Sequence, residues 1–99
     1  MNIDLSGKKA LVGASTSGIG KAIAKQLAAS GATVTLMSRS LEKLESVKQS
    51  LSTENSQQHQ LLQVDFTDYA AFKSIITSYF EKNSVDILVN NTQGPPPGT

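Results

Sequence analysis

The stretch of this chain best suited to chemistry is LVGASTSGIGKAIA at residues 11–24, a glycine-rich segment between an apolar run and a helical pattern. A helix N-terminus offers free backbone N–H groups and the positive end of the helix dipole, so it can bind an anion. Small residues leave the approach open. We therefore interpret this segment as a phosphate-binding turn that ends in the start of a helix. Its candidate binding residues are Gly13, Ser15, Thr16, Ser17, Gly18, Ile19 and Gly20.

Two phosphate-binding motifs that share these letters do not fit the spacing. A P-loop would place Lys and a hydroxyl residue after Gly18, where Ile19 and Gly20 stand. A G-x-G-x-x-G motif that starts at Gly18 would need a third glycine where Ile23 stands. An ordinary glycine-rich turn without a ligand remains the alternative to phosphate binding.

The rest of the chain alternates strand and helix patterns. Strands are predicted at 9–12, 33–37, 61–64 and 85–89, and the polar run 52–60 is predicted to be a loop with a solvated His59. Gly31 is the expected end of the first helix, and Ser40 and Asp68 are expected to cap the other two. The apolar stripes of the three helices are Ile19, Ala22, Ile23 and Leu27; Leu41, Leu44, Val47 and Leu51; and Phe72, Ile75, Ile76, Tyr79 and Phe80.

This alternation predicts an α/β fold, a Rossmann-type doubly wound parallel sheet with strand order 3-2-1-4. Right-handed crossovers place the first two helices on one face and the third on the other. The expected ligand site is the crevice at the carboxyl ends of the first and fourth strands, where the chain reverses direction across the sheet.

The end of the second strand indicates which dinucleotide fits. An acidic residue there binds the ribose hydroxyls of NAD(H), whereas an arginine accepts the 2′-phosphate of NADP(H). This chain has Ser38 and Arg39 at that place and no acid. A guanidinium matches phosphate geometry, so the sequence predicts NADP(H) as the cofactor. The alternative is a solvated surface arginine near a helix start.

The glycine motif resembles that of the short-chain dehydrogenase/reductase family, with Gly13-Ala14 in place of Thr-Gly and Gly18-Ile19-Gly20 intact. Two further stretches, VDFTD at 64–68 and NNTQG at 90–94, resemble that family's segments after the third and fourth strands. The resemblance implies that Asp65 meets the adenine amino group and Phe66 flanks the ring, and that Asn91 and Thr92 back the cofactor ribose. An N-cap turn served by Asp68 is the structural reading of VDFTD, and both can hold together. The departures are those of a divergent branch similar to 3-oxoacyl-carrier-protein reductases.

The resemblance also implies a reaction whose catalytic residues this chain lacks. Members of the family move hydride between NADPH and a carbonyl or alcohol substrate, using a Ser, a Tyr and a Lys four residues after the Tyr. Tyr69 and Lys73 have that spacing, but they follow the third strand rather than a later one, so they are not assigned a catalytic role. We expect residues 1–99 to be the N-terminal, dinucleotide-binding part of one Rossmann domain, inactive alone. The parent would be an NADP-dependent oxidoreductase, with a 3-oxoacyl thioester as one candidate substrate. A non-catalytic dinucleotide-binding or interaction module, complete as it stands, is the alternative.

The composition of the chain argues against several classes of binding partner. A net charge of +1 without a basic tract argues against nucleic acid, and no apolar run reaches transmembrane length. The chain has no cysteine, which fits a cytoplasmic protein, and no cluster that predicts a metal site. The family resemblance implies a homo-oligomeric parent that pairs through later helices. We also expect the first or fourth strand to leave apolar surface that the missing half would bury.

Overall fold

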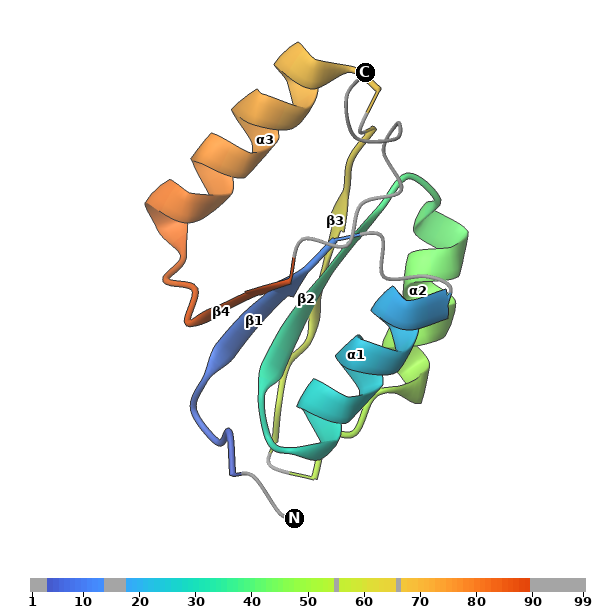
Figure 1. The fold of residues 1–99 in the computed structure, drawn as a ribbon, viewed down its shortest axis with the longest axis vertical. Coiled ribbons are helices and arrows are strands. Elements are labelled where there is room, and N and C mark those ends of the chain that lie inside the picture. The colour runs from blue at the N-terminus through green and yellow to red at the C-terminus, as the bar shows by residue number, and fades with distance from the viewer. Residues whose placement is uncertain (1–3, 14–17, 55, 66, 90–99) are drawn as a thin grey trace.

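The computed structural model describes residues 4–13, 18–54, 56–65 and 67–89. In chain order its elements are β1 (Lys9–Val12), α1 (Gly18–Ala29), β2 (Thr33–Ser38), α2 (Leu41–Ser50), β3 (Gln60–Gln63), α3 (Tyr69–Lys82) and β4 (Ile87–Val89) (Figure 1). This is the predicted alternation of strands and helices. The third strand begins and ends one residue earlier than predicted, and the fourth begins two residues later.

The four strands form one parallel sheet in the order β3-β2-β1-β4, as predicted. In the central pair, Ala10 lies opposite Val34 and Val12 opposite Leu36. On its other side β1 pairs with β4, where Leu11 lies opposite Leu88. Successive connections therefore run outward from β1 to β3 and then return to the far side of β1. The chain changes direction across the sheet between β1 and β4.

Helices cover the sheet unequally on its two faces, as the right-handed crossovers predict. The helices α1 and α2 lie on one face and α3 lies alone on the other (Figure 1). The core under α1 and α2 contains Ala10, Val12, Ala24, Ala28, Val34, Leu36, Leu44, Val47 and Leu51. Among the residues that the structure describes, the core under α3 has three buried apolar members, Leu11, Met37 and Val64, with half-buried side chains of α3 packed against them. The cover of the α3 face is correspondingly thinner.

The buried face of α1 differs from the predicted stripe. Gly20, Ala24 and Ala28 face the sheet, whereas Ile19 is 70% exposed and Ala22 is also exposed. Residues four apart share a helix face, and the absence of large side chains on this face lets the helix backbone approach the strands closely. The prediction was wrong for Ile19 and Ala22, whereas Ile23 is half-buried and Leu27 packs against the core. It failed at the first two because it ranked residues by hydrophobicity rather than by the space that the sheet leaves.

The segment before β3 also differs from the prediction of a solvated loop. His59 is only 4% exposed; its Nδ1 accepts the Val34 N–H at 3.0 Å and its Nε2 lies 2.7 Å from the Ser52 carbonyl. Gln57, also buried, donates from Nε2 to the Ala28 and Ala32 carbonyls. His59 thus pairs the Val34 N–H at the amino end of β2, which lies outside the register with β3, and Gln57 pairs carbonyls at the end of α1 and in the turn before β2. His59 is therefore a structural residue, and its prediction as solvated was wrong.

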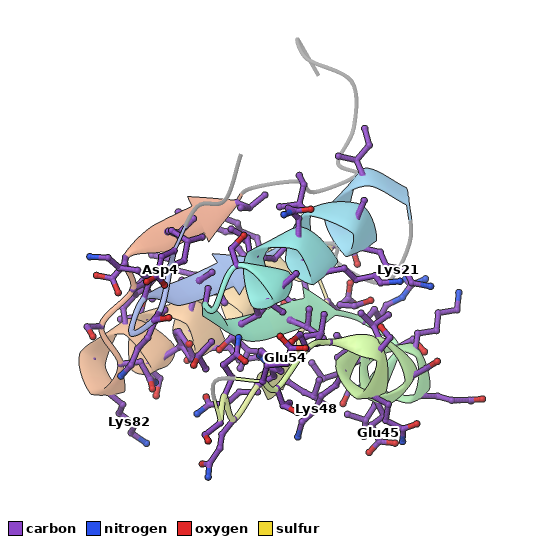
Figure 2. All side chains as sticks on the ribbon, turned by 90° about the horizontal axis from the view of Figure 1, so that it is seen from below. Asp4, Lys21, Glu45, Lys48, Glu54 and Lys82 are labelled. Atoms are coloured by element: carbon purple, nitrogen blue, oxygen red, sulfur yellow. The ribbon has the colours of Figure 1, made fainter. Side chains whose placement is uncertain are left out.

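The predicted N-caps of the second and third helices are confirmed, whereas two residues predicted to lie in apolar stripes are exposed. Ser40 and Asp68 cap α2 and α3 through their side chains, as predicted. Leu41 and Phe80, predicted to lie in apolar stripes, are exposed, and so is Leu88 in β4, at 59%. The charged side chains of Glu45 and Lys48 extend from α2 away from the body of the domain (Figure 2). In the part of the chain that the structure describes, no helix has the length and apolar character needed to cross a membrane.

Candidate functional site

The carboxyl ends of the strands meet along one edge of the sheet, because all four strands are parallel. Just beyond β1, the Gly13 N–H donates to the Val89 carbonyl at 2.9 Å, which joins the ends of β1 and β4. The place where the crevice was predicted, between the ends of the first and fourth strands, therefore holds a buried, hydrogen-bonded Gly13. This is the place in a doubly wound sheet where ligands bind.

The first turn of α1 stands at the same edge and is open. Gly18 begins the helix with φ +59°, and a Cβ built on it would meet no atom within 4 Å. Ile19 beside it is exposed, and Gly20 is buried against the sheet. The first turn carries no acidic side chain that could compete for its N–H groups. Free N–H groups, an open approach and no negative charge are what an anion needs.

The ends of β2 and β3 place a cation and a carboxylate near one another. Arg39 follows β2 with an exposed side chain, and its carbonyl accepts from Gln63 Nε2 at 3.0 Å. The Asp65 carboxylate accepts from the Thr67 hydroxyl at 2.6 Å and from the Thr67 N–H at 2.9 Å. These hydrogen bonds lower the pKa of Asp65 below its usual value, and the positive charge of Arg39 adds to the effect. The Thr67 hydrogen bonds thus hold the Asp65 carboxylate as an acceptor at the end of β3.

The structure describes some of the predicted site residues. Gly13, Gly18, Ile19, Gly20, Ser38, Arg39 and Asp65 all lie at the carboxyl ends of β1, β2 and β3 or at the start of α1. Ser15, Thr16, Ser17, Phe66, Asn91 and Thr92 fall outside the described residues. Lys21, which the prediction did not include, is exposed in the same first turn of α1. The position of Lys21 directly after Gly20 is the sequence signal that could have added it to the predicted residues.

Tyr69 and Lys73, which have the family's catalytic spacing, both lie on α3. Tyr69 is the first residue of α3 and is exposed, and Lys73 lines a shallow concavity on α3 with Ala70 and Ser74. Their spacing of four residues follows from helix geometry alone. Among the residues that the structure describes, no group of three or more His, Cys, Asp or Glu side chains is placed to hold a metal ion.

Comparison with known proteins gives consistent matches. Residues 8–97 match the family model described as short chain dehydrogenase. The chain is 39% identical over 85 residues to hydroxysteroid dehydrogenase-like protein 1 of Gallus gallus, covering 86% of this chain and 26% of that protein. It is 34% identical to the 3-oxoacyl-[acyl-carrier-protein] reductase of Aquifex aeolicus, covering 92% of this chain and 37% of that protein.

A solved structure extends the likeness to three dimensions. The L-sorbose reductase of Gluconobacter frateurii, complexed with NADPH and L-sorbose, superposes with a TM-score of 0.80 at 31% identity, covering 100% of this chain and 38% of that one. In all three cases the chain spans well under half the length of the protein that it matches. The family match, the parallel sheet and the glycine-rich start of α1 agree, and the chain belongs to the short chain dehydrogenase family.

Proposed function

We propose that this chain is the NADP(H)-binding part of an oxidoreductase of the short-chain dehydrogenase family. The observation that carries the proposal is that an open Gly18 and an exposed Arg39 lie at the same edge of the sheet. The first suits a pyrophosphate and the second an additional phosphate. The L-sorbose reductase, which matches the whole chain, is complexed with NADPH.

Each predicted residue takes a role that its chemistry allows. The turn residues Gly13, Ser15, Thr16 and Ser17, with Gly18, Ile19 and Gly20, would hold the pyrophosphate through backbone N–H groups and hydroxyls. Ser38 and Arg39 would hold the 2′-phosphate, because a guanidinium donates two parallel hydrogen bonds to it. Asp65 would accept from the adenine amino group, with Phe66 against the ring, while Asn91 and Thr92 would back the ribose.

The parent reaction is proposed as hydride transfer between NADPH and a carbonyl or alcohol substrate. A 3-oxoacyl thioester is the candidate substrate, supported by the likeness to the Aquifex aeolicus reductase. The residues 1–99 would supply the cofactor cradle and would be inactive alone, since the chain offers no Ser-Tyr-Lys set in the family's position. The cytoplasmic location and the homo-oligomeric parent expected from the sequence belong to this proposal.

The proposal that these residues are part of a longer domain is supported by the thin cover of the α3 face. Leu88 of β4 is 59% exposed, and it lies in register with the fully buried Leu11. Further chain packed there would remove this apolar surface from water. The competing proposal is a complete, non-catalytic dinucleotide-binding or interaction module. The intact mass of the natural protein separates the two, because a mass near 10.5 kDa supports the module and one more than twice as large supports the reductase.

The cofactor proposal is tested by reversing the charge at Arg39 in the full-length protein. Arg39→Asp should raise the dissociation constant for NADPH at least about tenfold and leave that for NADH within about threefold, because only NADPH carries the 2′-phosphate. Lys48→Asp is the matched control, since Lys48 is also exposed but lies seven residues along α2, about 10 Å from its N-terminus. Equal weakening of both cofactors by Arg39→Asp, or equal effects of the two variants, would contradict the assignment of Arg39.

A further inference from the structure

We infer that β3 pairs antiparallel with the β3 of a second copy of this chain, so that the two parallel sheets join into one continuous sheet across a two-fold axis. Among the described strands, β3 and β4 are the two ends of the sheet. The inference goes beyond the proposed function, because it concerns the outer side of β3, which the cofactor proposal does not use.

The outer side of β3 lacks the features that usually prevent strand pairing. Natural edge strands are commonly protected by charged residues or by proline. The run 57–64, which contains β3, has no Asp, Glu, Lys, Arg or Pro. Consecutive strands are usually neighbours in a sheet, so a strand that followed β4 in a longer chain would be expected beside β4. β3 would then remain an edge that can accept another strand.

The direction of the backbone groups determines the register of the pair. The Val64 N–H donates to the Ser38 carbonyl of β2 at 2.9 Å. Backbone groups of successive strand residues point to alternate sides, so those of Leu61 and Gln63 point away from β2. The antiparallel register that uses both residues pairs Leu61 of one copy with Gln63 of the other. The two copies of Leu62 then lie opposite each other, at the two-fold axis.

The position of α2 fits a second copy on this edge. α2 packs over both β2 and β3. In the joined sheet the strand order is β2-β3-β3-β2, so the two copies of α2 would stand two strand spacings apart, about 10 Å. Packed helices lie about 8–10 Å apart. The two copies of α2 would therefore contact each other without strain in the sheet.

The charges on α2 are complementary across the same axis. The exposed side chains of Glu45 and Lys48 line a concavity beside Leu61, and both extend from α2 away from the body of the domain (Figure 2). Around a two-fold axis the two copies of α2 run antiparallel, which brings Glu45 of each copy to Lys48 of the other. Leu41, 45% exposed, lies one turn before Glu45 on the same flank, where the second α2 would cover it. Strand pairing supplies the affinity, and the ion pairs set the register.

The first test uses the two-fold axis and the full-length protein. Leu62→Cys should form a covalent dimer under mild oxidation, because the Cα atoms of a directly opposed, non-hydrogen-bonded pair lie about 4.5 Å apart, within the span of a disulfide. Gln60→Cys is the matched control on the same face of β3, since the two copies of residue 60 would lie about 13 Å apart along the strands. Residues 1–99 contain no cysteine, and the unsubstituted protein, oxidised in parallel, reports any cysteine elsewhere.

The second test exchanges the charges, with the dimer dissociation constant measured by sedimentation. Glu45→Lys should raise this constant at least about fivefold, because two attractive pairs become repulsive. The double variant Glu45→Lys with Lys48→Glu should return to within about twofold of the unsubstituted protein, since the charges then exchange partners across the axis. Lys43→Glu is the control, because Lys43 is exposed but lies two residues earlier, about 200° around the helix. It should change the constant less than about twofold.

A covalent dimer formed by Leu62→Cys alone, together with recovery of association in the double variant, supports the inference. Absence of the Leu62→Cys dimer, or equal cross-linking by Gln60→Cys, overturns it. No effect of Glu45→Lys, or further weakening in the double variant, also overturns it, even where the protein associates through another surface. The NADPH titrations of Arg39→Asp test the proposed function separately.

Discussion

Gly18, the first residue of α1, has a left-handed backbone and leaves the approach to the helix N-terminus open. Replacing Gly18 by valine changes both properties, and their effects can be measured separately. Gly18 has φ +59°, and a side chain built there meets nothing within 4 Å. The cost to folding is therefore backbone strain rather than a clash, about 1–2 kcal/mol. A bound pyrophosphate, in contrast, would lie where the new methyl groups project.

The structure offers a matched control at Gly7. Gly7 has φ +82° and an equally empty surrounding, but it precedes β1, about 20 Å of strand away from the carboxyl edge. Gly7→Val should lower the free energy of unfolding by a similar 1–2 kcal/mol. It should leave cofactor binding unchanged.

The binding effect at Gly18 follows from the hydrogen bonds that the phosphate would lose. A hydrogen bond to a charged group contributes about 1.5–3 kcal/mol, so losing one weakens binding about 10- to 150-fold. NADPH titration by calorimetry, with circular dichroism to confirm folding, measures both variants in the full-length protein. Equal affinities for Gly18→Val and Gly7→Val would refute the assignment of the pyrophosphate to this turn.

Three further predictions concern residues around the sheet. His59→Leu should lower the free energy of unfolding by about 1–3 kcal/mol for each buried backbone group left unpaired, and His59→Asn by less because its amide oxygen can still accept from Val34; urea denaturation that finds no loss in the Leu variant would contradict this. Thr67→Val should raise the pKa of Asp65 toward its usual value in an NMR titration, because the largest cause of the lowering is the Thr67 hydroxyl. An unchanged titration of Asp65 in the variant would rule out this role of Thr67. Since the pKa of Asp65 is lower in the folded protein than in the unfolded one, the stability linked to Asp65 is present above the unfolded pKa and is lost as the pH falls through the folded pKa. Leu88→Ser should cost about 1.5–3 kcal/mol if the natural protein covers Leu88, and almost nothing if Leu88 stays exposed as it is here.

The order of the elements could be predicted from the sequence because local signals and global topology agree. Apolar strands alternate with helices, Ser40 and Asp68 occupy cap positions, and right-handed crossovers leave one simple strand order. The fold follows from rules that act on each segment in turn.

The predictions that failed depended on contacts between segments. His59 stands in a polar run, and only the short reach of β3 reveals that the Val34 N–H needs a partner there. The prediction that Ile19 lies on the buried face of α1 was wrong because close packing on the sheet favours the smaller Gly20 and Ala24 there. Neither fact is visible in a hydrophobic pattern, because each is set by the distance between two elements.

The candidate site could be predicted in outline for a similar reason. Gly18 and Arg39 lie at the carboxyl edge because that edge is fixed by strand direction, which the alternation predicts.

The most direct test of the account is the ratio of the dissociation constants for NADPH and NADH, measured on the full-length protein at one salt concentration. We predict that NADPH binds at least about tenfold more tightly, because Arg39 at the end of β2 meets a 2′-phosphate that NADH lacks. Equal affinities, or tighter binding of NADH, would contradict the account of this edge as an NADP(H) site.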